Sequence, residues 1–224
     1  MKKKVSIVSA FDYGIYFLKD TYWQIVWPIL ILGFIESVQI VTRSYLFIIP
    51  LTVNFLRVAV LYSIVKYMLN LAEKKHCNWY SMILSKEKYI NLFWYSTLGF
   101  LIFKLLLIIN NSLNMPIIDK ILLIVIIYFW IRFYFSAFFI VDHDVNLLES
   151  LKLSYMITKG FLVKMAIFFV VFILVNLTGV IVIIIGRWIF TYPLILGVSI
   201  YMYQKLVDNS TLDDKYKSDY SIKN

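Results

Sequence analysis

The chain has 224 residues, of which 62% are hydrophobic, and its mean hydropathy is +0.81. Soluble domains are typically about half apolar, so this composition excludes an ordinary soluble domain and predicts an integral membrane protein. The formal net charge of +9 is typical of proteins with basic cytoplasmic loops, and we therefore expect no nucleic-acid partner. Cys77 is the only cysteine, so no disulfide forms within the chain.

Six apolar blocks of membrane-spanning length follow one another along the chain. They cover residues 22–41, 45–69, 89–109, 121–141, 164–185 and 188–207, each near the ~20 residues that a bilayer core requires. Unbroken runs such as ILLIVIIYFW lack the alternation of a barrel strand. The sequence therefore predicts an all-α integral membrane protein with six transmembrane helices, residues 1–207. A polar, disordered cytoplasmic tail, residues 208–224, follows.

The orientation of these spans follows from the distribution of basic residues. Residues 1–19, 66–88, 152–164 and 205–223 carry sixteen lysines, whereas the loops on the other side carry only Arg43, Lys120 and Arg187. Cytoplasmic loops are enriched in Lys and Arg. We therefore expect both termini in the cytoplasm.

Small residues recur at intervals of four ahead of the first, third and fifth spans, and this spacing predicts a threefold repeat. The three groups are Ala10 and Gly14; Cys77, Ser81 and Ser85; and Ser150, Ser154 and Thr158. A lysine follows the first member of each group by nine residues, at Lys19, Lys86 and Lys159. We expect three units, residues 10–70, 77–142 and 149–207, each with an interfacial amphipathic helix followed by a two-span hairpin.

The segment ESLKLSYMITKG, residues 149–160, illustrates the role that we expect for these small residues. On a helical wheel its small hydroxyl residues form one ridge, which predicts close packing against a neighbouring helix at the membrane surface. Gly160 is expected to end this helix. Asp144 or Asn146 is expected to cap its beginning. Pro50 and Pro193 are expected to kink the second and sixth spans.

Four ionisable residues lie within the spans and are candidates for a binding site. Arg57 and Arg132 are placed near mid-membrane, whereas Glu36 and Lys104 lie nearer the outer ends. Charged residues are costly in a bilayer and often mark a functional site. One interpretation is an electropositive cavity for an anionic group such as a lipid phosphate. The other is that the arginines bind helix carbonyl groups, Asn54 or Glu36.

No motif indicates catalysis or a metal site. The sequence has no GxSG serine with a histidine partner, no HExxH and no P-loop. The triplet Asp142–His143–Asp144 is interpreted as a loop, because consecutive residues on a regular element cannot all face one metal. We expect no catalytic residues, no cofactor and no metal.

The C-terminal third is similar to a family of bacterial membrane proteins. The resemblance rests on an acidic residue after a span, Asp142, and on the stretches LESLKLSYMITKG, NLTGVIVIIIG and TYPLILGVSIYMY. In these features this part of the chain resembles the YciC-like proteins and the membrane domain fused to some glycerophosphodiester phosphodiesterases. The matching positions include Gly179, Gly186 and Pro193, which we expect to pack helices. The resemblance implies six helices in the bacterial cytoplasmic membrane and no established activity, and no catalytic residues can be carried over from it.

Two functions are compatible with these observations. The first is a non-enzymatic membrane protein that binds lipid, a membrane protein partner or a second copy of itself. The alternative is a small permease or substrate-binding subunit for an anionic or amphiphilic solute. A polar cavity around the two arginines would favour the permease, and an apolar lateral groove would favour lipid or partner binding.

Overall fold

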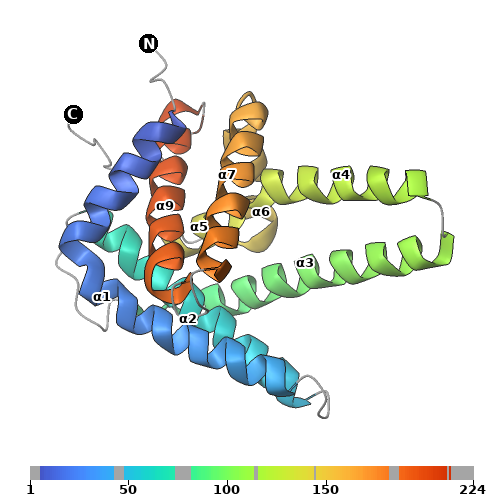
Figure 1. Cartoon of the computed structure of the whole chain (residues 1–224), viewed down its shortest axis with the longest axis horizontal. Coiled ribbons are helices and arrows are strands. Elements are labelled where there is room, and N and C mark those ends of the chain that lie inside the picture. The colour runs from blue at the N-terminus through green and yellow to red at the C-terminus, as the bar shows by residue number, and fades with distance from the viewer. Residues whose placement is uncertain are drawn as a thin grey trace.

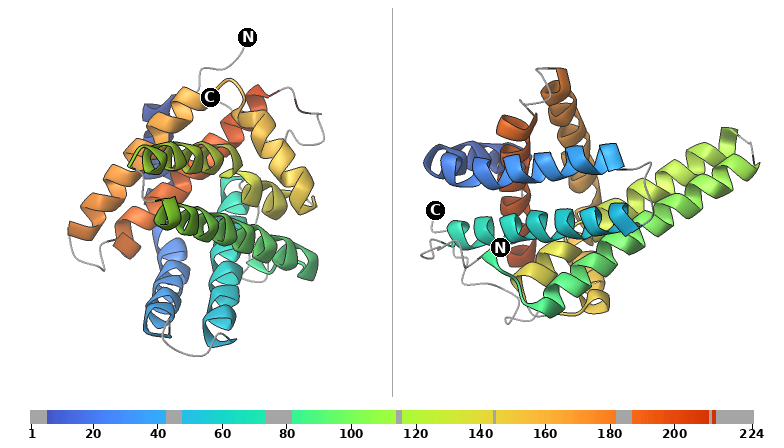
Figure 2. Two further views of the ribbon diagram at one scale, coloured as in Figure 1. Left: turned by 90° about the vertical axis from the view of Figure 1, so that its right-hand side faces the viewer. Right: turned by 90° about the horizontal axis from the view of Figure 1, so that it is seen from below.

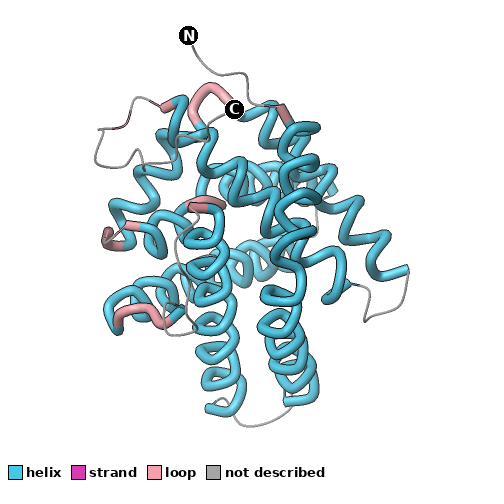
Figure 3. The backbone as a smooth tube through the Cα atoms, turned by 90° about the vertical axis from the view of Figure 1, so that its left-hand side faces the viewer, coloured by secondary structure: helices cyan, strands magenta, loops and turns pink. Residues whose placement is uncertain are grey.

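The computed structural model describes residues 6–42, 48–73, 82–113, 116–143, 145–181, 187–210 and 212. Within these ranges every regular element is a helix and none is a strand (Figure 3). In chain order the elements are α1 (Ile7–Thr42), α2 (Ile48–Ala72), α3 (Lys86–Leu113), α4 (Pro116–Phe133), α5 (Ser136–Asp142), α6 (Leu147–Thr158), α7 (Leu162–Ile181), the π-helix η2 (Arg187–Thr191) and α9 (Tyr192–Asn209). The predicted all-helical fold class is confirmed.

Two helical hairpins account for the first half of the molecule. The later part of α1 lies beside α2, and α3 lies beside α4 (Figure 1). The α3–α4 hairpin projects away from the remaining helices (Figure 2). Each hairpin joins two helices that are rich in apolar residues, so its members bury part of their side-chain surface against each other.

Several helices are long and apolar enough to cross a membrane. Within the described ranges these are Ile7–Val38, Thr52–Ala72 and Ile124–Asp142. A fourth crossing is added if Leu147–Thr158 and Leu162–Leu177, which are bent by 101° relative to each other, count as one broken span. The membrane character of the chain is thus supported, and the count of six spans remains a prediction.

Helix α9 is the most enclosed of the long helices, and the first part of α1 packs along it. The rings of Tyr13 and Tyr201 are in tilted contact with centroids 5.0 Å apart. Tyr22 lies 6.3 Å from Phe190 of η2, which directly precedes α9, so the two helices run antiparallel. Between these contacts, a Cβ built on Gly197 would lie 3.4 Å from the Cα of Gly14. The small residues therefore allow the two backbones to approach closely.

This pairing differs from the expected arrangement of the first repeat unit. A separate interfacial helix was expected before a span beginning at residue 22, whereas α1 is one helix that changes direction (Figure 1). Pro28 lies in its interior, and Thr21 Oγ1 donates a hydrogen bond to Phe17 O at 2.6 Å. Both features bend helices. A contact between Tyr22 and Phe190 also means that they cannot lie at opposite membrane faces, as the span boundaries 22 and 188 implied.

The helix expected at residues 149–160 is present as α6. Asn146 caps it by accepting a hydrogen bond from Glu149 N at 2.9 Å, whereas Asp144 lies outside the described residues. Gly160 follows the helix with φ of 88°, a conformation that glycine adopts without steric cost. The ridge residues Ser150, Ser154 and Thr158 are all fully buried. The position of α6 relative to a membrane surface remains a prediction.

The second unit does not show the expected pattern where it can be described. Ser85 is exposed and precedes α3 instead of lying within a helix, and its Oγ accepts a hydrogen bond from Lys88 N at 3.4 Å. It is therefore a cap residue. Cys77, Ser81 and Gly186 lie outside the described residues, and Gly179 belongs to α7, where its surroundings are not described.

The kink predicted at Pro50 is corrected by the position of the helix end, because Pro50 lies in the first turn of α2. A proline in a first turn interrupts no hydrogen bond, since the N–H groups there have no partner within the helix. Pro193 is buried where the π-helix η2 continues into α9, and its kink stays a prediction. Pro28 is the proline that lies in a helix interior.

Candidate functional site

Arg132 lies where the polypeptide breaks between α4 and α5. The interruption leaves backbone carbonyl groups without helical partners, and side chains from other helices bind them. Ser154 Oγ donates to Arg132 O at 2.8 Å, and Tyr95 OH donates to Phe133 O at 2.9 Å. In an apolar environment each unsatisfied carbonyl would be costly. The α6 ridge thus stabilises a helix break.

The guanidinium of Arg132 is enclosed by the same elements. It lies 5.3 Å from the ring centroid of Tyr128 and 4.8 Å from that of Tyr155. Its Nη1 donates to Thr158 Oγ1 at 3.4 Å, and its Nε has no hydrogen-bond partner among the described residues. Two aromatic rings and one hydroxyl therefore surround this buried cation.

Arg57 has a different partner. Its Nη1 lies 3.9 Å from Glu36 Oε1, and about a third and a quarter of the two side chains are exposed, 34% and 26%. Both residues lie on helices that are long and apolar enough to cross a membrane, where pairing with an opposite charge reduces the cost of each ion. The partner of Arg57 is thus one of those anticipated from the sequence. Lys104 lies on α3, but the surroundings of its side chain are not described.

The anion cavity around the two arginines stays a prediction, and the described contacts of the two side chains differ. Arg57 faces a carboxylate, whereas Arg132 is enclosed by tyrosines and a hydroxyl. A pair of arginines that binds one anion must direct guanidinium N–H groups to a common point. The contacts in this structure give each arginine its own partner instead.

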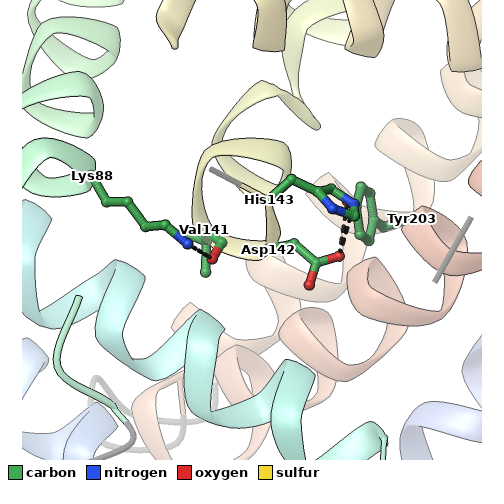
Figure 4. A network of polar contacts seen from close by, with 5 residues as sticks. All are labelled: Lys88, Val141, Asp142, His143 and Tyr203. Carbon is green, nitrogen blue, oxygen red and sulfur yellow. Dashed lines mark hydrogen bonds and ion pairs between the residues drawn. The ribbon is translucent and has the colours of Figure 1, made fainter. Parts of the chain in front are cut away.

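A second polar cluster lies at the end of α5 (Figure 4). Tyr203 OH, from α9, donates to Asp142 Oδ2 at 3.1 Å. His143 Nε2 lies 3.4 Å from the same oxygen. On the other side, Lys88 Nζ from α3 donates to Val141 O at 3.1 Å. Three helices that are distant in sequence are joined here by polar contacts.

His143 lies just beyond the apolar segment Ile124–Asp142. Burial lowers the pKa of its imidazole below the ordinary value, and the ammonium groups of Lys88 and Lys66 act in the same direction. The carboxylates of Asp142 and Glu73 oppose this effect on the pKa of His143. The neutral imidazole is therefore the form that the folded protein favours.

An open groove of about 730 Å³ lies between α1 and the beginning of α9. Its apolar walls include Leu18 and Trp23 of α1, Phe190 of η2 and Leu194 of α9. Lys19 and Asp20 also line it, and both are exposed. Ligand sites typically have volumes of about 300–1,000 Å³ and mainly apolar walls with a few polar groups. This groove has those properties.

Sequence reasoning missed both the cluster at Asp142 and the groove. Asp142 and His143 were assigned to a loop, and the contributions of Lys88 and Tyr203 come from helices that no local pattern connects to them. Lys19 was noticed only for its spacing. The aromatic pair Tyr22–Trp23, which follows Lys19 and Asp20 after one residue, is a signal for a membrane interface that could have identified the groove.

Metal binding has no support in the described ranges, where no group of three or more His, Cys, Asp or Glu side chains could hold an ion. The fold and these sites together define an all-helical protein with several potential membrane-spanning helices. No family model, curated protein or solved structure matches this chain. The resemblance to the YciC-like proteins remains a prediction.

Proposed function

We propose that this chain is a non-enzymatic integral membrane protein that binds a membrane lipid in the groove between α1 and α9. The groove itself is the observation that carries the proposal. Trp23 and Phe190 on its walls are 70% and 65% exposed, so their apolar surface is available to a lipid. An acyl chain in the groove would pack against both side chains.

The arrangement of the arginines supports lipid binding over transport of an anionic solute. A permease for such a solute needs a polar cavity with convergent cations, whereas Arg57 and Arg132 have separate partners. An apolar lateral groove with charges at one part of its lining suits an amphiphile. The proposed ligand is therefore a lipid, and the proposed role is accessory or envelope maintenance.

The proposed location is the bacterial cytoplasmic membrane, with both termini in the cytoplasm. The antiparallel contacts of α1 with α9 support this orientation, because they bring the beginning of α1 and the end of α9 to the same end of the pair. The orientation is tested by substituting cysteine for Asn111 and for Asn224 and labelling the thiols from outside intact cells. Asn111 should be accessible and Asn224 protected, and equal labelling would contradict the orientation.

Lipid binding is tested by native mass spectrometry of the protein purified in a mild detergent. The Trp23→Ala variant should retain less phospholipid, because it loses part of the groove wall. Trp27→Ala is the matched control, since Trp27 is also on α1, is 62% exposed and does not line the groove. Equal lipid retention by the two variants would contradict the proposed site.

A further inference from the structure

The charges that line the groove allow a more specific statement about its lipid, which rests on the proposed function. Lys19 and Asp20 are neighbours in α1, and both are exposed. Neither forms a hydrogen bond or ion pair with another side chain among the described residues. Both charges are therefore available to a ligand.

These two side chains offer complementary chemistry. The lysine ammonium provides three N–H donors and a positive charge, which suit a phosphate oxygen. The aspartate carboxylate only accepts hydrogen bonds when ionised, and it suits a group that carries both positive charge and N–H donors. Their combined charge is zero, so a purely anionic headgroup would gain from Lys19 and be repelled by Asp20.

The aromatic residues beside them fix where the headgroup would lie. Tyr22 and Trp23 are in edge contact at 5.3 Å, and Tyr22 reaches Phe190 of η2 at 6.3 Å. Tyr and Trp favour the interface between lipid chains and headgroups. Lys19 and Asp20 precede this aromatic pair in α1 with one residue between them, as expected if they lie at headgroup level.

We propose that the groove selects a zwitterionic phospholipid with a primary ammonium, whose phosphate contacts Lys19 and whose ammonium contacts Asp20. A choline headgroup carries the same charges but cannot donate an N–H hydrogen bond to the carboxylate. A phosphoglycerol headgroup lacks the positive charge. Both should bind less tightly than phosphoethanolamine with the same acyl chains.

The test is a lipid titration of the intact protein, followed by native mass spectrometry, with phosphoethanolamine, phosphocholine and phosphoglycerol lipids of identical chains. The wild-type protein should prefer phosphoethanolamine by about fivefold, the scale expected for solvent-exposed charge pairs. Asp20→Asn should remove most of this preference. Lys19→Gln should weaken the binding of all three lipids, because each has a phosphate.

Two matched variants control for general effects of charge. Asp12→Asn changes an exposed acid on the same helix outside the groove, and Lys152→Gln changes an exposed lysine on α6. Both should leave the headgroup preference unchanged.

The outcomes separate this inference from the proposed function. If Trp23→Ala reduces binding but the wild type binds the three headgroups equally, the groove binds lipid without the proposed selectivity. An Asp20→Asn variant that keeps the phosphoethanolamine preference would also overturn the inference. Absence of bound lipid in the wild type would overturn both proposals.

Discussion

Ala10 and Gly14 on α1 share a spacing with Ser150, Ser154 and Thr158 on α6, but the two groups make different contacts. At Gly14 the absence of a side chain lets α9 approach, and an added Cβ would lie 2.8 Å from Val198 Cγ2. At Ser154 the side chain is needed, because its hydroxyl binds the Arg132 carbonyl at the α4–α5 break. A small-residue spacing therefore predicts close packing without specifying whether space or hydrogen bonding is required.

Among the substitutions that test this comparison, Ser154→Leu should reduce the stability of the protein most. Leucine adds volume at a fully buried position and removes the hydrogen bond to Arg132 O. We expect a loss of about 3 kcal/mol in the free energy of unfolding, measured by reversible denaturation in mixed micelles. Ser154→Ala should cost only about 1 kcal/mol. Lys152→Leu, which places leucine on the exposed side of α6, should be nearly neutral, and equal losses at 152 and 154 would contradict the packing.

Gly14→Ala and Gly99→Ala should have opposite effects on stability. Alanine is favoured over glycine in helices by up to about 1 kcal/mol. A Cβ at Gly14 meets Val198 Cγ2 at 2.8 Å, whereas one at Gly99 meets nothing within 4 Å. Gly14→Ala should therefore destabilise by about 1–2 kcal/mol, and Gly99→Ala should stabilise. Thermal unfolding of both variants measures the difference, and the same sign for both would show that α1 and α9 are not in close contact.

Arg132→Met and Arg132→Lys should separate the two roles of the buried arginine. Methionine keeps much of the apolar stem and removes a buried cation, so its stability should equal or exceed the wild type by up to about 1 kcal/mol. Lysine keeps the charge but loses the guanidinium contacts with the rings of Tyr128 and Tyr155, and we expect it to cost about 1 kcal/mol. Chemical denaturation of the two variants gives both values. A large loss with methionine would instead indicate an anionic partner.

Arg57→Met tests the ion pair between Arg57 and Glu36 and is compared with Arg132→Met. Because Arg57 and Glu36 are 3.9 Å apart on two candidate spans, the change removes this ion pair and should cost about 1 kcal/mol. Bound lipid should be unchanged, since neither residue lines the groove. Loss of co-purified lipid on this substitution would support the anion site that the sequence suggested.

The pH dependence of stability should be the smallest effect, and it tests the cluster at Asp142. Because burial lowers the pKa of His143 in the folded state, the unfolded chain takes up a proton first as the pH falls. The contribution of His143 to the free energy of unfolding should therefore be largest above about pH 6.5, the ordinary pKa of histidine. It should decrease as the pH falls below this value. Unfolding between pH 5.5 and 7.5 measures this slope. His143→Gln should flatten it, and an unchanged slope would assign the dependence to other groups.

The sequence by itself determined the all-helical class, the membrane character and the local ends of α6. These three properties are set by residues that are close to one another in the sequence. Long apolar runs must satisfy their own backbone hydrogen bonds, Asn146 binds an N–H three residues ahead, and Gly160 takes a positive φ within a single turn. Each of these effects acts over a few residues, so the local pattern is sufficient to predict it.

Only the tertiary structure decided which helices face one another. Gly14 packs against Gly197, and Asp142 binds Tyr203, so these contacts join distant parts of the chain. His143 approaches the same carboxylate from just beyond the end of α5. The repeat spacing suggested that Ala10 and Ser85 would act like Ser150, yet Ala10 is fully buried and Ser85 is exposed and caps α3. Apolar helices have many surfaces of similar hydrophobicity, and shape and hydrogen bonding between whole helices select among them.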